Sequence, residues 1–543
     1  MRLHSHWPTI EHAFGCALPD RFLMAIRSFD NAKTVTPFIL EKKDGKRFGL
    51  FLHVEKGNAQ AAMLPAQIEQ RFYNPYYNFD AGEQSPAVKR NLEELLDELA
   101  AGERELVLDD HVPQSIVRRL EKRFEISFDN MMGIGSVRAR RLEPHEVIEV
   151  LSRERPNGRR IAKKIIEKSR HREALSGFLD RHEDGRFALL DKLLSGEDLQ
   201  SLIVTSALNV QELTGLPMRG NSRALAAVYS RDKGLWRIAA GPQSEGKEYP
   251  SLRVAIEEIT GKGRAGVEMD DMPAWMFSAM GLRDREAVPA DNLVRMWRDS
   301  STLPDLAFYI LAARASAHAI MKALAFASMH RSSRITEMDA YKVYLDELYG
   351  YVSAHAPELR VARTLTNFHC GNRTIFPSNP AAHPIDERIN TLKIDAGCMI
   401  FDRSGTLLGC SDIARTLCLT KDGEEIYQIF RDSVVDRLIP ACKIGADGAS
   451  IHRLAVEDLK RVNLPGNTLS RAVAVPADFD RDVGHVLGKN NLSHVQFTAS
   501  GHAVLREGMI ACCEYQWPLK GHTVAYEDTG LVTGSGGLNF TID

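Results

Sequence analysis

The stretch Cys410-Ser-Asp-Ile-Ala-Arg-Thr416 decides the fold of the C-terminal part of the chain, because it is one of five segments that carry an ordered set of possible metal ligands. In chain order the set is Asp, Asp, His, Glu, Glu. Four carboxylates and one imidazole suit divalent first-row ions such as Mn, Co, Fe or Zn, and carboxylates can bridge two ions about 3.5–4 Å apart. The candidates are Asp395 in Lys-Ile-Asp-Ala-Gly, Asp412 in Cys-Ser-Asp-Ile-Ala, His485 in Gly-His-Val-Leu-Gly, Glu514 in Cys-Cys-Glu and Glu527 in Ala-Tyr-Glu-Asp-Thr-Gly.

The residues around these ligands resemble those of the pita-bread metallopeptidases, the family of methionine aminopeptidase, prolidase, aminopeptidase P and creatinase. Ser411–Thr416 is similar to the family's Ser-Asp-Ile-Thr-Arg-Thr, and Leu505–Met509 is similar to the segment before the first catalytic-domain glutamate. One such fragment alone is a weak signal, because short motifs also match by chance. Five in order, each in its matching context, favour the family over scattered acidic residues at strand ends.

The resemblance implies a role for each ligand. Asp395 would chelate one ion, and Asp412 and Glu527 would bridge both. His485 and Glu514 would complete the second ion, and Glu514 would also relay a proton. The implied cofactor is two divalent metal ions, with manganese as first choice and cobalt, iron or zinc as alternatives.

The composition is that of an ordinary globular protein. The 543 residues are 44% hydrophobic and 26% charged, and this length predicts about three or four domains. With a net charge of −3, no broad basic surface is expected, and we predict no nucleic-acid binding. The basic clusters Arg138–Arg141 and Arg159–Lys164 are interpreted as solvated helix faces or linker.

Neither a membrane span nor a secretory leader is predicted. No apolar run approaches the roughly 18–20 residues that cross a bilayer, and the N-terminal Met-Arg-Leu-His-Ser-His-Trp-Pro lacks the apolar core of a signal peptide. Seven of the eight cysteines lie in the last third of the chain, without a Cys-x-x-Cys pair. Buried thiols in a reducing compartment explain this pattern most simply, so we expect a cytoplasmic protein that does not contact membranes.

Two regions ahead of the ligand set repeat one order of predicted elements. In both, strands alternate with a helix whose leucines or isoleucines have helical spacing. Leu108-Asp-Asp-His-Val-Pro113 and Met269-Asp-Asp-Met-Pro273 fall at the same stage of each region, which indicates two copies of one α/β module. The predicted strands are 34–40, 48–54, 105–109, 202–205, 224–229 and 265–269, and the predicted helices are 92–99 and 252–259.

The second copy resembles the N-terminal domain of creatinase and aminopeptidase P, in which a strand precedes an Asn-x-x-x-Leu-Thr-Gly turn, here Asn209–Gly215. The resemblance is close over 198–543 and loose over 20–165, and 143–198 is a charged, helix-prone connector. It implies the three-domain form of aminopeptidase P. The predicted domains are a creatinase-like α/β module at 1–165, the connector and second module at 166–300, and an α+β pita-bread catalytic domain at 301–543.

The catalytic domain is expected to begin with helices over 305–321 and 336–348, on the outside of a curved antiparallel sheet with the metals on its concave face. Asp395 and Asp412 would lie on two strands of one hairpin. The 17-residue step between them includes the turn-rich 401–406, an insertion relative to the family. Because a longer turn costs little free energy, ligation should survive, while the rim of the pocket should differ.

The substrate-facing residues depart from the family pattern. Family peptidases carry a substrate-contacting histidine before the first aspartate, but the alignment places Phe376, Pro377 or Ser378 there. His383 could take over this catalytic role only through a rearranged loop. Loss of a general acid would cost about 10²–10⁴-fold in rate.

Two further departures flank the glutamates. Tyr515 follows Glu514 where the family usually has proline, and Ala525 stands where proline-specific members often have an arginine. We therefore predict slow or absent cleavage of simple Xaa-Pro dipeptides. His494 resembles a downstream family histidine that bonds the substrate, with a structural histidine as the alternative, whereas a structural role is favoured for His502.

The leading interpretation is a dinuclear metallohydrolase of the aminopeptidase P or prolidase type, in which a metal-bound hydroxide attacks an amide bond. The first alternative is a diverged enzyme acting on a non-peptide metabolite, and the second is a binding protein that has lost catalysis. The expected substrate is a small peptide or an amide-containing small molecule. We also expect a homodimer in which the N-terminal modules of one chain help wall the active site of another.

Overall fold

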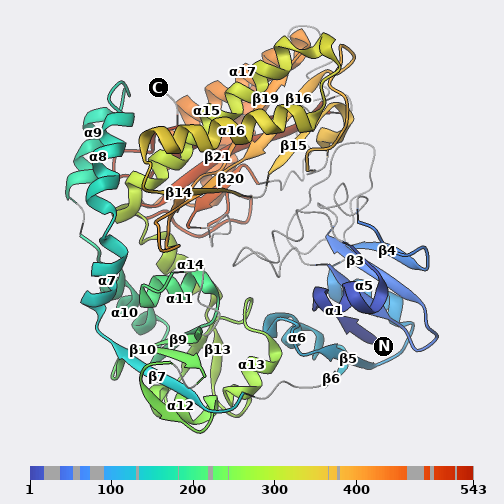
Figure 1. Ribbon diagram of the computed structural model, residues 1–543, viewed down its shortest axis with the longest axis vertical. Coiled ribbons are helices and arrows are strands. Elements are labelled where there is room, and N and C mark those ends of the chain that lie inside the picture. Colours follow the sequence, from blue (N-terminus) through green and yellow to red (C-terminus); the bar gives the residue numbers. More distant parts are fainter. Residues whose placement is uncertain are drawn as a thin grey trace. The chain divides into compact units, whose positions relative to one another are not determined.

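The computed structural model covers the whole chain, and two compact units are distinguished within it (Figure 1). Unit 1 comprises the described parts of Met1–Tyr76, Val88–Leu151 and Gly185–Arg298, and unit 2 comprises those of Ser152–Asp184 and Asp299–Asp543. The residues that the structure describes are 1–17, 37–52, 62–73, 91–129, 134–181, 183–217, 224–241, 244–364, 366–375, 379–461, 482–489, 495–519 and 522–541.

The first module of unit 1 is a six-stranded sheet in the order β4-β3-β2-β1-β5-β6. Strand β1 is central, antiparallel to β2 and parallel to β5. Helix α5 begins with a capping box in which Asn91 and Glu94 bond each other's backbone N–H, and its leucines are buried against the sheet. The elements are β1 (Arg2–His4), α1 (Trp7–Phe14), β2 (Phe38–Glu41), β3 (Arg47–Leu52), β4 (Ile68–Tyr73), α5 (Leu92–Ala100), β5 (Glu105–Asp109), α6 (Gln114–Leu120) and β6 (Glu125–Asp129).

The second module is a seven-stranded sheet in the order β11-β7-β10-β9-β8-β12-β13. Its central strand β8 is antiparallel to β9 and parallel to β12. The segment Asn209–Gly215, expected as a turn, is instead the body of helix α11 and its C-cap, where Gly215 adopts a left-handed φ of 71°. The elements are β7 (Val137–Leu142), α7 (Pro144–Ser152), α10 (Arg186–Gly196), β8 (Ser201–Val204), α11 (Ala207–Thr214), β9 (Ala224–Ser230), β10 (Gly234–Ala240), β11 (Lys247–Tyr249), α12 (Leu252–Thr260), β12 (Ala265–Val267), α13 (Ala274–Ala279), β13 (Ala287–Pro289) and α14 (Asp291–Asp299).

The two sheets have one topology, which confirms the predicted duplication. The run β3-β2-β1-β5-β6 corresponds strand for strand to β10-β9-β8-β12-β13, with the same parallel and antiparallel pairings. The second sheet differs in having β7 inserted between β10 and the edge strand β11. The predicted strands and helices of both regions are confirmed where they are described, although 34–36 and 53–54 lie outside the described residues.

The two matching segments, 108–113 and 269–273, pair with each other. Pro113 and Pro273 form an antiparallel bridge. Gln114 N donates to Met272 O at 2.9 Å, and Ala274 N donates to Val112 O at 3.0 Å. These two bonds are reciprocal, so within unit 1 the modules meet through equivalent residues about a local pseudo-twofold axis.

Unit 2 is built on two long helices that pack along each other, α15 (Leu306–Met329) and α16 (Glu337–His355) (Figure 1). Helix α15 continues to Met329, beyond the predicted end at 321. The expectation that no apolar run has the length of a membrane span was wrong, because Leu303–Met329 passes by length and composition. Most of this segment is buried, as in the core helix of a folded domain. Connector helices α8 (Arg155–Ile165) and α9 (Arg172–Arg181) also belong to unit 2, and α8 packs on α15.

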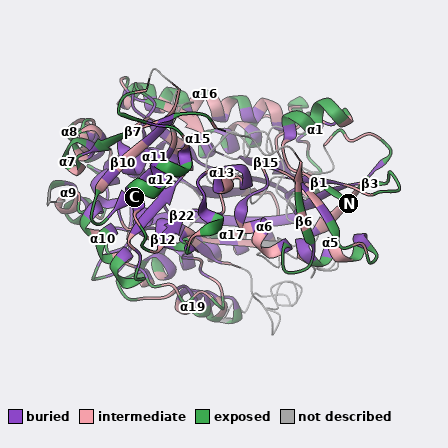
Figure 2. Cartoon of the chain, turned by 90° about the horizontal axis from the view of Figure 1, so that it is seen from below, coloured by how far each residue is buried: buried purple, intermediate pink, exposed green. Residues whose placement is uncertain are grey.

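The strands of unit 2 form three small sheets, in the orders β14-β17-β18, β15-β16-β19 and β20-β21-β22-β23. Strands β19 and β22 contact each other across the last two sheets. Every residue of β22 is buried (Figure 2). The elements are β14 (Arg360–Arg363), β15 (Asn367–Cys370), β16 (Thr391–Ala396), β17 (Cys398–Phe401), β18 (Leu407–Cys410), β19 (Ile413–Cys418), α17 (Lys421–Ser433), a π-helix (Val434–Leu438), α18 (Ile439–Ala441), α19 (Gly448–Arg461), β20 (Gly484–Leu487), β21 (Ile510–Leu519), β22 (His522–Leu531) and β23 (Leu538–Asn539).

The hairpin that carries the two aspartates is interrupted about halfway along its length. Strand β16 pairs with β19, and β17 pairs with β18 beyond the break. At the break lies Gly397, where a Cβ would come within 1.7 Å of Ser411 O, so only glycine fits. The inserted residues lengthen β17 and β18, and Asp402 closes their turn by accepting bonds from Ser404 Oγ and Thr406 N.

Candidate metal centre

The candidate ligands lie on neighbouring strands of unit 2. Asp395 is on β16, and Asp412 stands between β18 and β19, next to the Gly397 break. His485 is on β20, and Glu514 and Glu527 are cross-strand partners on β21 and β22. Strand pairing within two sheets, together with the contacts of β16 and β19 with β22, brings these separate positions of the sequence close together.

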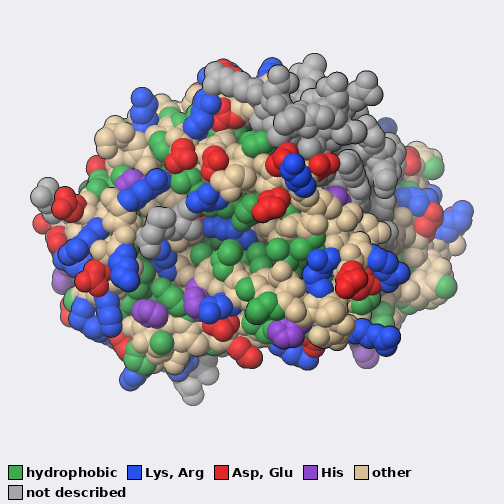
Figure 3. Space-filling model, turned by 90° about the horizontal axis from the view of Figure 1, so that it is seen from above, with side chains coloured by type: hydrophobic (Ala, Val, Ile, Leu, Met, Phe, Trp, Pro, Cys, Tyr) green, Lys and Arg blue, Asp and Glu red, His purple; other side chains and the backbone are tan. Residues whose placement is uncertain are grey.

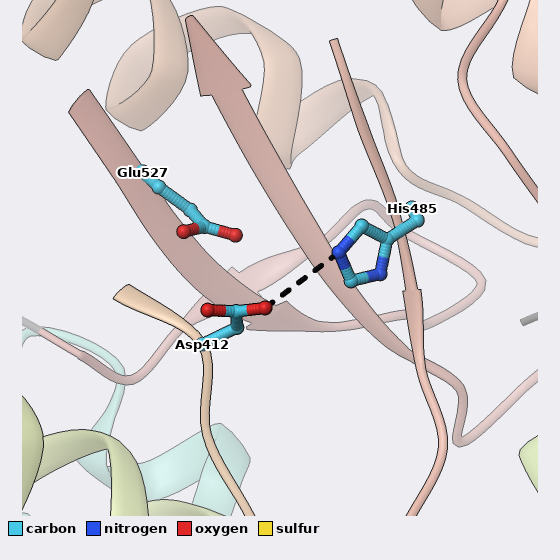
Figure 4. Close-up of side chains that lie close together, drawn as sticks. All are labelled: Asp412, His485 and Glu527. Atoms are coloured by element: carbon cyan, nitrogen blue, oxygen red, sulfur yellow. Dashed lines mark ion pairs between the residues drawn. The ribbon is translucent and has the colours of Figure 1, made fainter. Parts of the chain in front are cut away.

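Three of these side chains form a compact group (Figure 4). One ligand atom each of Asp412, His485 and Glu527 lies within 4.8 Å of the others, and His485 Nε2 is 3.8 Å from Asp412 Oδ2. The other ring nitrogen, Nδ1, lies 3.1 Å from the Val486 carbonyl oxygen. A carbonyl accepts only from an N–H, so Nδ1 carries the proton and leaves the Nε2 lone pair directed at the carboxylates, as a metal-ligating imidazole requires.

Glu527 is the most deeply buried of the five, with a 2% exposed fraction. Burial raises the pKa of its carboxyl well above the usual value, and the nearby carboxylates of Asp412, Glu514 and Asp395 raise it further. The guanidinium of Arg415 lowers this pKa, but it is already bonded to Asp528 Oδ1 at 2.5 Å and to the Glu527 backbone.

The donor set therefore fits divalent metal ions. Converging carboxylates are costly to bury unless a cation compensates them. Oxygen ligands with one imidazole match hard or borderline divalent ions, and the group around Asp412, His485 and Glu527 has the spacing of a shared coordination sphere.

Asp395 and Glu514 approach each other through a side chain that the sequence did not single out. Gln516 Nε2 donates to Asp395 Oδ2 at 3.3 Å and to Glu514 Oε2 at 2.7 Å. Asn367 Nδ2 also donates to Asp395 Oδ2, at 3.1 Å. Lys393 Nζ donates to Gln516 Oε1 at 2.8 Å. A signal was present, because residues two apart in a strand share a face: Lys393 precedes Asp395 by two positions, and Gln516 follows Glu514 by two.

The remaining predicted residues are less closely associated with this group. His494 and the segment 376–378 lie outside the described residues. His383 is half-buried, its backbone carbonyl accepts from Glu337 N at the start of α16, and its ring lies near Asp386, whose pKa is lowered chiefly by Arg388 and slightly by His383. These contacts do not place His383 in a catalytic role, so that role stays a prediction.

The two departures beside the glutamates occupy different positions. Tyr515 is buried in the core and its hydroxyl lies 3.0 Å from Ser433 Oγ. Ala525 faces Gln516 across the β21–β22 pair and is bonded through its backbone to Thr416 Oγ1.

On the face of the molecule in Figure 3, basic and acidic side chains are interspersed over the described surface.

Comparison with known proteins defines the class. Residues 310–534 match the sequence model of metallopeptidase family M24. An Xaa-Pro dipeptidase from Bacillus anthracis is 17% identical over 66% of this chain and 98% of its own, with a TM-score of 0.51. An X-prolyl aminopeptidase from Caenorhabditis elegans, described as a cytosolic enzyme with a di-nuclear active site, is 11% identical over 96% of this chain and 85% of its own, with a TM-score of 0.55. No curated protein matches the sequence of the chain.

Residues 310–534 therefore carry the M24 metallopeptidase domain, and the two solved structures show that the chain shares their fold. The predicted fold class is confirmed, since creatinase-like α/β modules precede an α+β pita-bread domain. Metal-dependent peptide hydrolysis is the class of activity that this family supports.

Proposed function

We propose that this protein is a dinuclear-metal-dependent hydrolase that cleaves an amide bond in a small peptide or a related small molecule. The observation that supports the proposal most directly is the convergence of Asp412, His485 and Glu527, with Asp395 and Glu514 adjoining them. A pair of carboxylates that can bridge, flanked by terminal ligands, is the arrangement a two-ion site requires.

The proposed ligands are the five residues predicted from the sequence, Asp395, Asp412, His485, Glu514 and Glu527. Bound divalent ions, with manganese as first choice, would supply water activation and polarisation of the scissile carbonyl. Glu514 is half-buried and one of its oxygens is held by Gln516. The Glu514 carboxylate would also take a proton from the attacking water and return it to the departing amine. His494 and His383 are the proposed candidates for contacting the substrate.

The substrate is proposed to differ from a simple Xaa-Pro dipeptide. Ala525 has no charged group with which to hold a peptide, and the facing Gln516 is engaged with Asp395 and Glu514. A non-peptide amide metabolite is the alternative that these same positions favour. A purely binding role is less well supported, because a fold without metal gains nothing from burying Glu527 among three other carboxylates.

Two experiments test the proposal in sequence. Protein purified without chelator is incubated with Mn²⁺ or Co²⁺ and its metal content is measured, with about two ions per chain expected. The loaded protein is then assayed on Xaa-Pro peptides and on a panel of amide metabolites. Protein that takes up no metal contradicts the proposal, and metal-loaded protein that turns over nothing on either panel leaves only the binding role.

The proposal includes a cytoplasmic homodimer in which the modules of unit 1 from one chain contribute to the active-site wall of the other. It rests on the sequence resemblance and on the absence, among the described residues of unit 1, of any group of three or more clustered metal-ligating side chains. Light scattering measures the mass directly, and a monomer near 60.6 kDa at working concentration would contradict the dimer. The domain boundaries at 165 and 300 remain predictions.

A further inference from the structure

We propose that Gln516 is a positioning residue that sets the separation of two candidate metal ligands, Asp395 and Glu514, and that Lys393 fixes the orientation of its amide. The inference rests on the proposed metal centre and adds residues that belong to neither the ligand set nor the predicted catalytic set. Gln516 and Lys393 would act through the ligands, without touching substrate.

The strands place these side chains together. Gln516 is on β21, two positions after Glu514, so both point to the same face, and Lys393 is related in the same way to Asp395 on β16. Strands β16 and β21 belong to different sheets, so the Gln516 side chain joins ligands that backbone pairing alone does not connect. Ala525, the cross-strand partner of Gln516, presents only a methyl group beside it.

The hydrogen bonds of Gln516 use its amide fully. Its NH₂ group has two protons, and these go to Asp395 Oδ2 at 3.3 Å and Glu514 Oε2 at 2.7 Å. Its carbonyl oxygen accepts from Lys393 Nζ at 2.8 Å. The amide bonds only one oxygen of each carboxylate, so its two hydrogen bonds do not occupy the second oxygens.

Lys393 determines which way the amide points. An ammonium group can only donate, so it selects the carbonyl end of Gln516 and leaves the NH₂ end for the carboxylates. A reversed amide would place its oxygen against two carboxylates and its NH₂ against an ammonium. Lys393 has a 2% exposed fraction, and burial removes the water that would otherwise compete for these bonds.

The consequence is a preorganised pair of ligands. Two carboxylates repel each other in the metal-free protein, and a ligand free to turn away must be reordered when the ion binds. A side chain that holds metal ligands in place typically contributes about 10–100-fold to metal affinity. Gln516 should therefore matter for metal affinity more than for the stability of the fold.

The test compares Mn²⁺ affinity with metal-free stability in the full-length protein. Gln516→Met keeps the approximate size of the side chain and removes all three hydrogen bonds. We expect it to weaken Mn²⁺ binding by about 10–100-fold in calorimetric titration, with a metal-free melting temperature close to that of the wild type. The matched control is Gln428→Met, because Gln428 Nε2 also donates to a carboxylate, Asp432, at 2.7 Å on the exposed face of α17. This variant should bind Mn²⁺ like the wild type.

A double-mutant cycle isolates the role of Lys393. Removing its charge strengthens cation binding by Coulomb's law, whereas releasing the Gln516 amide weakens it, so the single variant Lys393→Met mixes two effects. In the Gln516→Met background the contact with the amide is absent, so the difference between the two backgrounds isolates the contribution of that contact. The measured quantity is the change in the Mn²⁺ dissociation constant that Lys393→Met causes in each background. We expect this change to be less favourable for binding, by at least about threefold, when Gln516 is present than in the Gln516→Met background.

The possible results separate this inference from the proposed function. A wild type that binds no Mn²⁺ overturns the proposed metal centre and the inference with it. If Gln516→Met binds Mn²⁺ as tightly as the wild type, the inference is overturned but the proposed metal centre is not. Equal effects of Lys393→Met in the two backgrounds overturn the role of Lys393, and a loss of affinity in Gln516→Met matched by an equal loss in Gln428→Met overturns positioning at this site.

Discussion

Units 1 and 2 each bury a glutamate, and the two are treated in opposite ways. Glu268 has a 3% exposed fraction and accepts bonds from Thr205 N at 2.8 Å, from Ser206 N at 2.9 Å and from Ser206 Oγ at 2.8 Å. Glu527, with a 2% exposed fraction, faces three other carboxylates. The hydrogen-bonding oxygens of Glu268 are satisfied by these N–H and O–H donors, and Glu268 thereby holds the loop after β8. Glu527 is destabilising by itself, which is the property expected of a metal ligand.

The duplication strengthens this contrast. In the first module Asp109 has the position of Glu268 and accepts from Ser5 N, from Ser5 Oγ at 2.6 Å and from His6 N at 3.0 Å. Both copies of the module therefore use a carboxylate as an acceptor for the loop after the central strand. The clustered carboxylates of the candidate site, by contrast, repel one another, as is common where carboxylates are gathered for a functional role.

The largest expected effect is the loss of a bridging ligand. Asp412→Ala should abolish both metal loading and activity, because one carboxylate is expected to hold both ions. Elemental analysis and turnover measure the two effects. The control is Asp402→Ala, since Asp402 is also a buried aspartate of this hairpin but closes its far turn, and it should load metal normally. Full activity in Asp412→Ala would place the active site elsewhere.

Substrate specificity tests how far the set of metal ligands alone defines the activity of the enzyme. The metal-loaded protein should cleave simple Xaa-Pro dipeptides slowly or not at all, because each missing charged hydrogen bond removes about 1.5–3 kcal/mol. Steady-state kinetics decide the point. A kcat/KM within the usual range of about 10⁴–10⁸ M⁻¹s⁻¹ would instead establish a plain aminopeptidase P, with His383 or another residue in place of the missing histidine.

The structural carboxylate of unit 1 should affect stability but not metal. Glu268→Ala leaves the buried donors of Thr205 and Ser206 unsatisfied and should cost at least about 3 kcal/mol, at 1–3 kcal/mol for each of the three groups. The first thermal transition should shift down while Mn²⁺ content stays at the wild-type level. Asp109→Ala is the matched variant in the other module. Metal loss in either variant would mean that these carboxylates also serve the metal centre.

The smallest predicted effect is a pH dependence of the metal-free protein. The raised pKa of Glu527 means that the folded state binds more protons than the unfolded state, so stability should fall as pH rises above the ordinary glutamate range. Added Mn²⁺ should therefore raise the melting temperature more at pH 8 than at pH 5, because protons compete for the same oxygens.

Glu527→Gln is the informative variant for this effect. It removes one of the repelling charges and should raise the metal-free melting temperature at pH 8 by about 2–4 °C per kcal/mol recovered, while removing the response to Mn²⁺. A metal-free wild type whose melting temperature rises between pH 5 and pH 8, with no gain in Glu527→Gln, would contradict the origin assigned to the shift.

The sequence by itself determined the fold class and the order of the candidate ligands. Alternating and helically spaced apolar residues identified both modules of unit 1, and the short match between 108–113 and 269–273 indicated their duplication. These features are local, since periodicity and turn residues act over a few neighbours. The long helix α15 shows the limit, because its length and composition fit a membrane span equally well until its burial is known.

Only the tertiary structure determined which side chains lie beside each candidate ligand. The sequence could name Asp395 and Glu514, which are 119 positions apart, but not that the Gln516 amide lies between them or that Lys393 is buried against that amide. Those contacts depend on how strands from separate sheets approach each other, which is set by packing across the whole domain. The raised pKa of Glu527 has the same origin, because burial and neighbouring charge exist only once the chain has folded.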